Sequence, residues 1–126
     1  MGKEKNDTIL FVDDDKVLCF LFKRSFGNLF NIEFAKDATE ALEVMDSSSV
    51  NVILSDHHLP GITGIELLKM VKVKYPSTTR IFVTGSEDEE IRKTAERECE
   101  IAHFIPKPWD ETKLKEILTD IISKNN

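Results

Sequence analysis

The sequence predicts an α/β domain in which a parallel sheet is covered by helices on both faces. Three observations support this prediction. Short apolar runs recur along the chain, helical apolar patterns separate them, and each run ends in polar or turn-forming residues. Strands buried on both faces form such continuous apolar runs, and their alternation with helices implies right-handed crossovers between parallel strands. With 126 residues and no linker-like or repeated segment, we expect residues 1–126 to form one domain with its core over 8–122.

The first half of the chain predicts two strands and two helices. Thr8–Val12 is an apolar run that stops at three aspartates, and Asn31–Ala35 alternates apolar and polar residues. The helix between them, Lys16–Phe26, is closed by a glycine. We expect its buried face to carry the apolar residues with near-helical spacing, which are Val17, Phe20, Leu21 and Phe26. Asp37 can cap the next helix, whose apolar residues follow the spacing i, i+3, i+4, i+7.

The second half repeats the pattern three times. The further predicted strands are Val50–Leu54, Arg80–Val83 and Ala102–Ile105. A helix over Ile65–Tyr75 ends before a proline. Ser86 and Glu89 form a candidate capping box for a fourth helix that runs to about Glu98. The last helix has the clearest amphipathic stripe in the chain, made of Leu114, Ile117, Leu118, Ile121 and Ile122.

Composition limits the classes of function. Lys plus Arg total 17 and Asp plus Glu total 23, so the net charge is −6; this argues against direct nucleic-acid binding, which favours a basic face. The longest apolar run is far shorter than the roughly 20 residues that cross a bilayer. Cys19 and Cys99 lack CxxC spacing and are expected to be reduced, buried thiols. We therefore expect a cytoplasmic protein without a membrane segment.

Polar residues follow four of the predicted strands, and the carboxyl ends of parallel strands meet at one edge of the sheet. They are Asp13, Asp14 and Asp15 after the first strand, Asp56, His57 and His58 after the third, Thr84 after the fourth and Lys107 after the fifth. Neighbouring carboxylates repel one another unless a cation intervenes, and oxygen ligands favour a hard ion such as Mg²⁺. A carboxylate in this setting can act as a nucleophile toward phosphorus.

Several of these residues also have simpler interpretations. We assign Asp15 to the first turn of the following helix, where a negative charge is favourable, rather than to a metal site. His57 and His58 are adjacent on an extended segment and point opposite ways, which disfavours a transition-metal site. Lysines and an arginine around the third helix are expected to form a solvated face; they are Lys69, Lys72, Lys74 and Arg80.

At these residues the chain resembles the receiver domain of two-component response regulators, the CheY-like family. Four segments carry the resemblance, each at the end of a predicted strand: ILFVDDD, VILSDHHLPGITG, IFVTG and FIPKPW. The resemblance extends from about Thr8 to Ile122. It implies a (βα)5 flavodoxin-like fold with strand order 2-1-3-4-5. It also implies a phosphorylation-controlled module of a two-component phosphorelay, not an enzyme that turns over substrates.

The resemblance implies a role for each matching residue. Asp56 would accept the phosphoryl group. Asp13, Asp14, Asp56 and the backbone carbonyl of His58 would hold Mg²⁺, for which Mn²⁺ could substitute. Lys107 would contact a phosphoryl oxygen, and its peptide bond to the following proline would be cis.

The resemblance also implies a switch. Thr84 would move toward the phosphoryl group, and Phe104 would move into the space behind it. The face made by the fourth helix, the fifth strand and the fifth helix would then shift. His58 and Ser86 flank the approach of a hydrolytic water and would tune the lifetime of the phosphoryl group. The fourth helix has a thin apolar stripe, which makes it either a moving part or simply a solvated surface helix.

The implied phosphoryl donor is a sensor histidine kinase or a histidine phosphotransfer protein. An effector domain or target protein would bind the switched face, where a phosphorylation-dependent homodimer could also form. The sequence does not identify the kinase, the target or whether the receiver stands alone.

Two other functions remain open: a Mg²⁺-dependent phosphohydrolase with Asp56 as nucleophile, and a pseudo-receiver that binds partners without phosphorylation. His58 in place of a second aspartate argues against the first, and the intact Thr84 and Lys107 argue against the second.

Overall fold

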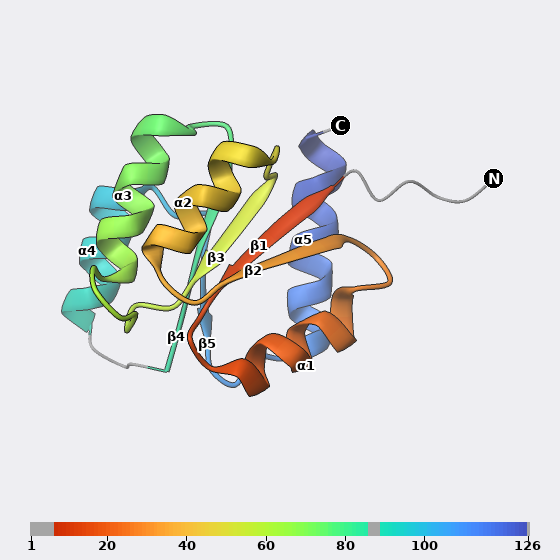
Figure 1. Cartoon of the computed structure of the whole chain (residues 1–126). Helices are drawn as coiled ribbons and strands as arrows, with labels where there is room; N and C mark the ends of the chain where they lie inside the picture. The colour runs from red at the N-terminus through yellow and green to blue at the C-terminus, as the bar shows by residue number, and fades with distance from the viewer. Residues whose placement is uncertain (1–6, 86–88, 126) are drawn as a thin grey trace.

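Five parallel strands form one sheet between two layers of helices (Figure 1). In the computed structural model, which describes residues 7–85 and 89–125, the strands are β1 Thr8–Val12, β2 Asn31–Ala35, β3 Val52–Ser55, β4 Thr79–Thr84 and β5 His103–Pro106. The helices are α1 Lys16–Phe26, α2 Ala38–Ser47, α3 Gly64–Lys74, α4 Glu89–Cys99 and α5 Glu111–Asn125. The strand order is β2-β1-β3-β4-β5. The predicted fold class and strand order are therefore confirmed.

The observed boundaries differ from the predicted ones by one or two residues. β3 begins at Val52 rather than Val50, and β4 extends to Thr79 and Thr84 at its two ends. The cause is pairing between strands, since the Thr79 amide donates to Asn51 O at 3.0 Å and aligns the start of β4 with β3. The predicted capping box at Ser86 lies outside the described residues. Within the described part of the chain, no helix is long and apolar enough to cross a membrane.

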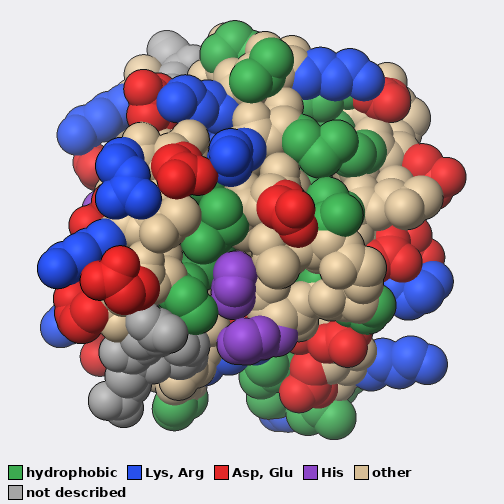
Figure 2. All heavy atoms as spheres, turned by 90° about the vertical axis from the view of Figure 1, so that its left-hand side faces the viewer, with side chains coloured by type: hydrophobic (Ala, Val, Ile, Leu, Met, Phe, Trp, Pro, Cys, Tyr) green, Lys and Arg blue, Asp and Glu red, His purple; other side chains and the backbone are tan. Residues whose placement is uncertain are grey.

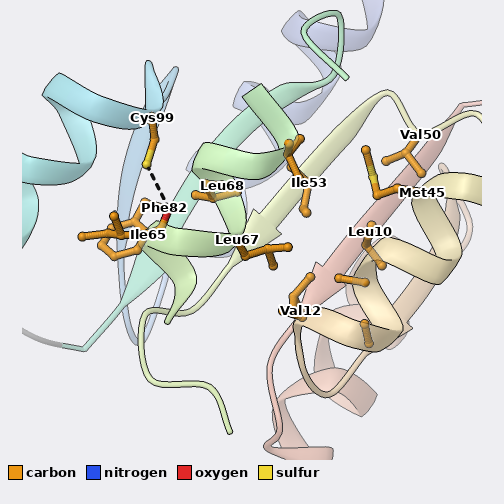
Figure 3. Packing of buried hydrophobic residues seen from close by; sticks show 14 of the residues in the cluster. Leu10, Val12, Met45, Val50, Ile53, Ile65, Leu67, Leu68, Phe82 and Cys99 are labelled. Atoms are coloured by element: carbon orange, nitrogen blue, oxygen red, sulfur yellow. Dashed lines mark hydrogen bonds between the residues drawn. The ribbon is translucent and has the colours of Figure 1, made fainter. Parts of the chain in front are cut away.

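Side chains of each strand alternate between two hydrophobic cores. Leu10 and Val12 face the layer of α2, α3 and α4, where Ile53 and Phe82 join them (Figure 3). The residues between them on β1 face the layer of α1 and α5. Because every residue of β1 is buried, each strand of the sheet centre must be apolar on both faces, which explains the continuous apolar runs of the sequence.

The predicted buried face of α1 is wrong for Val17, Phe20 and Leu21 and right for Phe26. Val17, Phe20 and Leu21 are 66%, 64% and 42% exposed, whereas Phe22 and Phe26 are fully buried. The ring of Phe22 stacks on that of Phe11 in β1, with ring centroids 4.4 Å apart, and lies 4.9 Å from the ring of Phe26. This aromatic contact fixes the rotation of the helix. The side of α1 that faces the core therefore carries Phe22 and Phe26, with half-buried Leu18 and Cys19 beside them. The opposite side of the helix is left in solvent.

Side chains cap the N-termini of α1, α2 and α3. Asp15 caps α1, because its Oδ1 accepts from the amides of Val17 at 2.9 Å and Leu18 at 3.2 Å. It thus acts one residue before the predicted first turn. Asp37 caps α2 as predicted. Thr63 and Glu66 form a capping box at the start of α3. These caps set where each helix leaves the carboxyl edge of the sheet.

α3 begins in close contact with the end of β3. The Gly64 amide donates to His57 O at 2.9 Å. A Cβ atom on Gly64 would lie 2.0 Å from Asp56 O and 2.9 Å from the His57 Cα. Both are backbone atoms of the segment that follows β3, so they cannot swing aside as a flexible side chain could. Only glycine permits this approach.

The basic residues around α3 do not form a simple solvated face, and for Arg80 the prediction is wrong. Arg80 is 8% exposed. Its Nε donates to Cys99 O at 2.8 Å, and its Nη1 donates to Thr78 O at 2.8 Å. Lys69 Nζ lies 3.2 Å from Glu98 Oε1 on α4. On this side of the molecule basic and acidic side chains are interleaved (Figure 2), and the observed pairs hold the C-terminal end of α4 against α3 and β4.

Both cysteines are free, Cys99 buried and Cys19 half-buried. Cys99 Sγ donates to Ile65 O at 3.4 Å and so joins α4 to α3 (Figure 3). Burial, together with nearby Glu98, raises the pKa of Cys99 to about 11. The expected reduced thiols are consistent with this arrangement, and Cys99 serves packing.

The rotation of α1 predicts unequal effects of two alanine substitutions. Phe22→Ala should lower the free energy of unfolding by about 3–5 kcal/mol, because it empties a buried aromatic site. Phe20→Ala should change it by less than about 0.5 kcal/mol, because that ring is largely in solvent. Urea unfolding of both variants measures the difference. Equal losses would contradict the observed orientation of the helix.

The close approach at Gly64 predicts that Gly64→Ala destabilises the fold by at least about 1–3 kcal/mol, since the clash is with backbone. Gly85→Ala is the matched control, because a Cβ there would have Lys107 Cβ at 3.9 Å as its neighbour, an ordinary contact. Thermal unfolding of the two variants compares them. A Gly64→Ala protein as stable as Gly85→Ala would show that the start of α3 can move away from β3 at little cost.

Candidate functional site

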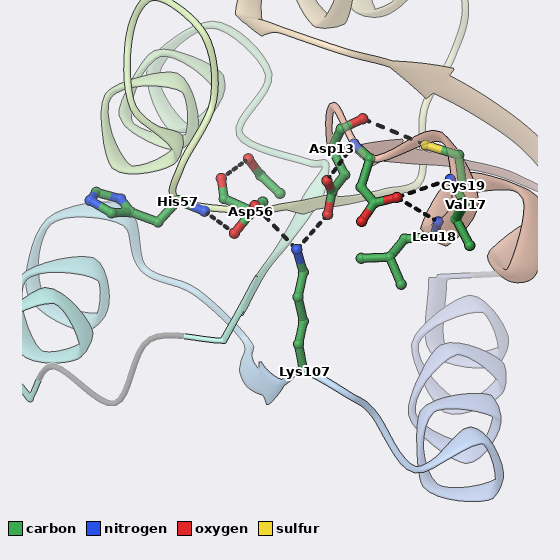
Figure 4. Close-up of polar contacts among 9 residues, drawn as sticks. Asp13, Val17, Leu18, Cys19, Asp56, His57 and Lys107 are labelled. Carbon is green, nitrogen blue, oxygen red and sulfur yellow. Dashed lines mark hydrogen bonds and ion pairs between the residues drawn. The ribbon is translucent and has the colours of Figure 1, made fainter.

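The ammonium group of Lys107 lies between two buried carboxylates (Figure 4). Lys107 Nζ is 2.6 Å from Asp13 Oδ2 and 3.1 Å from Asp56 Oδ2. The side chains of Asp13 and Asp56 are 1% and 9% exposed, and that of Lys107 is 18% exposed. Three residues that follow β1, β3 and β5 are thus brought together at the carboxyl edge of the sheet, as the sequence predicted for their positions.

Backbone hydrogen bonds hold each of these residues in place. The Asp13 amide donates to Ala35 O at 3.0 Å, the Asp56 amide to Val12 O at 3.0 Å, and the Lys107 amide to the last residue of β4 at 3.1 Å. Each bond continues the pairing of neighbouring strands by one residue. The three charged side chains therefore start from positions set by the strand register and not by a free loop.

Asp56 is also fixed by its neighbours in sequence. Its Oδ1 accepts from the His57 amide at 2.8 Å, which leaves Oδ2 directed at Lys107. Its backbone carbonyl accepts from the buried Ser55 hydroxyl at 2.8 Å, and Gly64 abuts the same carbonyl. Sequence reasoning missed Ser55 and the need for Gly64. The only local signals were a serine at the end of an apolar strand and a glycine at the start of a helix.

The charges in the site depend on one another. Burial lowers the pKa of Lys107, but its hydrogen bond with Asp13 and the negative charges of Asp56 and Asp13 outweigh burial, so the pKa of Lys107 is raised above its usual value. Lys107 is therefore fully protonated at neutral pH. Without it, the two neighbouring carboxylates would repel one another. The ammonium group thus balances part of the negative charge in the site.

The donor set suits a hard divalent ion. Asp13 Oδ2 is buried and forms an ion pair with Lys107, and Asp56 Oδ2 points to the same ammonium group. Asp14 is exposed, and in residues 7–85 and 89–125 no three acidic, histidine or cysteine side chains are grouped closely enough to hold a metal alone. Mg²⁺ commonly uses one or two carboxylates and keeps several waters. Asp13 and Asp56 fit that pattern, with Asp14 beside them.

The predicted switch residues lie next to the site. Thr84 is buried at the end of β4, beside β5. Phe104 is half-buried on β5, with its ring centroid 5.6 Å from that of Phe82. The Lys107–Pro108 peptide bond is cis, as the resemblance implied.

The histidines lie apart from the charged centre. The His57 ring points away from Lys107 (Figure 4) and lies 5.7 Å from the Phe82 ring. The His58 side chain is exposed and meets the His57 ring at 5.0 Å. The roles of the His58 carbonyl and side chain stay predictions, and Ser86 lies outside the described residues.

Cys19 lies close to the site but is unsuited to nucleophilic chemistry. Its Sγ donates to Asp13 O at 3.5 Å. Burial, with the charges of Asp13 and Asp15, raises the pKa of Cys19 to about 11. The protonated thiol is a poor nucleophile, so Asp56 is the stronger candidate in this site.

Trp109 connects the site to the core beneath α1. It follows Lys107 by two residues, and its ring meets the rings of Phe11 and Phe22 edge-on at 5.7 and 5.9 Å. A change in the position of Lys107 would therefore be transmitted to the only tryptophan in the sequence. Trp109 is therefore placed to report on the site.

Comparison with known proteins agrees with this geometry. A signal receiver domain of an HD domain-containing protein from Pseudomonas fluorescens Pf-5 has a TM-score of 0.91 and 34% identity, over 98% of this chain and 92% of that one. The hydrogenase transcriptional regulatory protein HoxA of Cupriavidus necator is 34% identical over 106 residues, which are 84% of this chain and 22% of HoxA. A cyclic di-GMP phosphodiesterase of Thermotoga maritima is 35% identical over 106 residues, 80% of this chain and 27% of the relative.

The chain therefore spans about a fifth to a quarter of the length of these curated relatives. The family model of the response regulator receiver domain matches residues 9–119, which run from the second residue of β1 through β5 and into α5. The ion-paired carboxylates, the strand order and this match agree, and the chain belongs to the response regulator receiver domain family of two-component systems.

Proposed function

We propose that Asp56 accepts a phosphoryl group from a phosphohistidine and that the chain works as a phosphorylation-controlled signalling module. Receiver domains generally serve signalling rather than turnover of substrates, and the family implies interaction with histidine kinases and effector domains. The ion-paired arrangement of Asp13, Lys107 and Asp56 is the observation that carries the proposal. It offers one anionic oxygen beside a fixed cation, which is the setting that phosphoryl transfer requires.

The chemistry follows from these contacts. Asp56 Oδ2 attacks phosphorus, the P–N bond to the donor imidazole breaks, and the imidazole leaves with the electron pair and takes up a proton. Lys107 then meets a phosphoryl oxygen in place of the Asp56 carboxylate oxygen. Asp56 Oδ1 stays hydrogen-bonded to the His57 amide, so the attacking oxygen keeps its direction. The Thr84 hydroxyl is proposed to bond a second phosphoryl oxygen.

Receiver domains generally bind Mg²⁺, and here Asp13, Asp14, Asp56 and the His58 carbonyl are the proposed ligands, with Mn²⁺ as a substitute. The ion would neutralise the negative charge that builds up on the phosphoryl oxygens. Asp13 would hold this cation through Oδ2, while its Oδ1 remains bonded to the Asp15 amide at 2.9 Å.

We further propose that the donor protein docks on the exposed apolar residues of α1. Val17, Phe20 and Leu21 are large hydrophobic residues in solvent, and they extend directly from the segment that carries Asp13. A hollow of about 230 Å³ next to them is lined in part by Leu21, Pro108 and Trp109. The patch therefore adjoins both Asp13 and Lys107, so a helix seated on it would bring a phosphohistidine to Asp56.

The output is proposed to pass through α4, β5 and α5 to an effector domain, a target protein or a second copy of the chain. The names of the relatives with 34% and 35% identity describe different activities, a transcriptional regulatory protein and a cyclic di-GMP phosphodiesterase. The identity of the output therefore depends on parts beyond the receiver, and we propose only the face that would deliver the signal.

The central test is beryllofluoride binding with Mg²⁺, followed by Trp109 fluorescence. The wild-type protein should respond, because beryllofluoride bound to Asp56 occupies the place of a phosphoryl group. Asp56→Asn should abolish the response. Asp120→Asn is the matched control: it removes the same charge from the exposed Asp120–Lys124 pair on α5 and should respond as the wild type does. A response in Asp56→Asn would exclude Asp56 as the acceptor.

The shared ammonium group predicts a metal-dependent effect on stability. Lys107→Met should lower the free energy of unfolding by about 3 kcal/mol without Mg²⁺, because it leaves two buried carboxylates without a counter-charge. Mg²⁺ should restore part of that loss, since the divalent ion replaces the missing cation. Urea unfolding with and without Mg²⁺ measures both effects, with Lys115→Met on the outer surface of α5 as control. A loss that Mg²⁺ leaves unchanged would contradict the proposed metal site.

Docking on α1 predicts a difference between protein donors and small donors. Phe20→Ser should lower the rate of labelling by a histidine kinase that labels the wild type, by about tenfold or more for an interface anchor. The rate of labelling by acetyl phosphate should stay unchanged, because Asp56 is untouched. Val73→Ser is the control, because Val73 is 82% exposed on α3, away from this patch. Equal loss with both donors would contradict a docking role.

A further inference from the structure

A cation–π contact joins α4 to the aromatic residue of the proposed switch. The guanidinium carbon of Arg92 on α4 lies 5.0 Å from the centroid of the Phe104 ring on β5. Arg92 Nε is also 3.3 Å from Glu96 Oε2, one turn further along α4. The carboxylate thus orients the guanidinium group toward the ring. On its other side the Phe104 ring meets Phe82 of β4.

Polar contacts hold the C-terminal end of α4 to α3 and β4. Cys99 O accepts from the buried Arg80, and Cys99 Sγ donates to Ile65 O of α3. Glu98 pairs with Lys69. Arg92 lies about two helical turns before these contacts, and its aromatic partner Phe104 is on a different element, β5. Arg92 therefore connects α4 to β5 separately from the contacts at the C-terminal end of the helix.

The contact occurs together with the two ion pairs of Lys107. Lys107 is paired with both carboxylates here, and a phosphoryl group on Asp56 would take up one of those oxygens and draw Lys107 to itself. The position of Phe104 under Arg92 accompanies this pairing. An interaction present in one of two states favours that state by its own free energy, so removal of the interaction favours the other state.

We propose that Arg92 is a positioning residue that holds Phe104 and α4 in the unphosphorylated arrangement, and so sets how readily the module switches. The proposal rests on the function proposed for Asp56, and it adds that Arg92 regulates the response to phosphorylation of that residue. Movement of the Phe104 ring breaks the contact with the guanidinium group. The protein must therefore give up the cation–π interaction when it responds to the phosphoryl group, which lowers its affinity for the activated state.

Beryllofluoride titration with Mg²⁺, read by Trp109 fluorescence, measures this effect. Arg92→Gln should bind beryllofluoride about two- to fivefold more tightly than the wild type, which corresponds to about 0.4–1 kcal/mol at 1.4 kcal/mol per factor of ten. Arg97→Gln is the matched control. It removes the same charge from the same helix, and Arg97 contacts the neighbouring Glu98 rather than Phe104. Its affinity should equal that of the wild type.

A double-variant comparison separates the ring contact from a general charge effect. In a Phe104→Leu background, Arg92→Gln should cause no further change in affinity, because the aromatic partner is gone. A persistent increase in that background, an equal increase in Arg97→Gln, or no increase in Arg92→Gln each overturns the role of Arg92 while leaving Asp56 as the acceptor. A wild-type protein that does not bind beryllofluoride overturns the proposed function itself, and the two failures are thus distinct.

Discussion

One ammonium group shared by two buried carboxylates governs the carboxyl edge of this sheet. Lys107 reaches both Asp13 and Asp56 at ion-pair distance, and without it the two acids would repel one another. Such buried pairs add little net stability, because desolvation of the charges offsets their attraction. In the proposed function, the ammonium group exchanges its contact with the Asp56 carboxylate for a contact with a phosphoryl oxygen. The proposed chemistry depends on that exchange.

Backbone hydrogen bonds fix the positions of these three charged residues. Amide hydrogen bonds from Asp13, Asp56 and Lys107 extend the pairing of the sheet beyond the strand ends, and Ser55 and Gly64 confine the peptide that follows β3. Asp56 is therefore held by rigid elements. α4 is joined to β4 by the contact of Cys99 O with Arg80 and to β5 by the contact of Arg92 with Phe104. A rigidly held Asp56 and a helix joined to the neighbouring strands suit the proposed module, which binds a group at one place and responds at another.

Two faces adjoin the site and differ in chemistry. The outer side of α1 exposes large apolar residues, whereas the α3–α4 side carries paired acids and bases (Figure 2). The aromatic cluster of Phe11, Phe22 and Trp109 lies beneath α1 and joins the first face to Lys107. The apolar face of α1 is the proposed donor surface, and the proposed output face, made by α4, β5 and α5, is separate from it. Relatives whose names describe different activities contain a segment similar to this chain, which agrees with a site that is independent of the output.

The sequence by itself determined the fold class, the alternation of strands and helices and the residues at the strand ends. Each of these depends on local patterns: apolar runs for Thr8–Val12, a cap at Asp37, and charged residues where a run stops. The family resemblance added the strand order and the cis bond at Lys107, and both agree with the structure.

The tertiary structure decided what depends on contacts between distant segments. Two apolar stripes compete on α1, and only the stacking of Phe22 on Phe11 selects the buried one. In the sequence Arg80 is only one of several basic residues. In the fold it holds the end of α4, because its side chain donates a hydrogen bond to Cys99 O. Position 64 requires glycine because a Cβ atom there would lie 2.0 Å from the backbone oxygen of Asp56. Periodicity records which residues can be buried, whereas the packing partner, and hence the choice among them, exists only once the chain has folded.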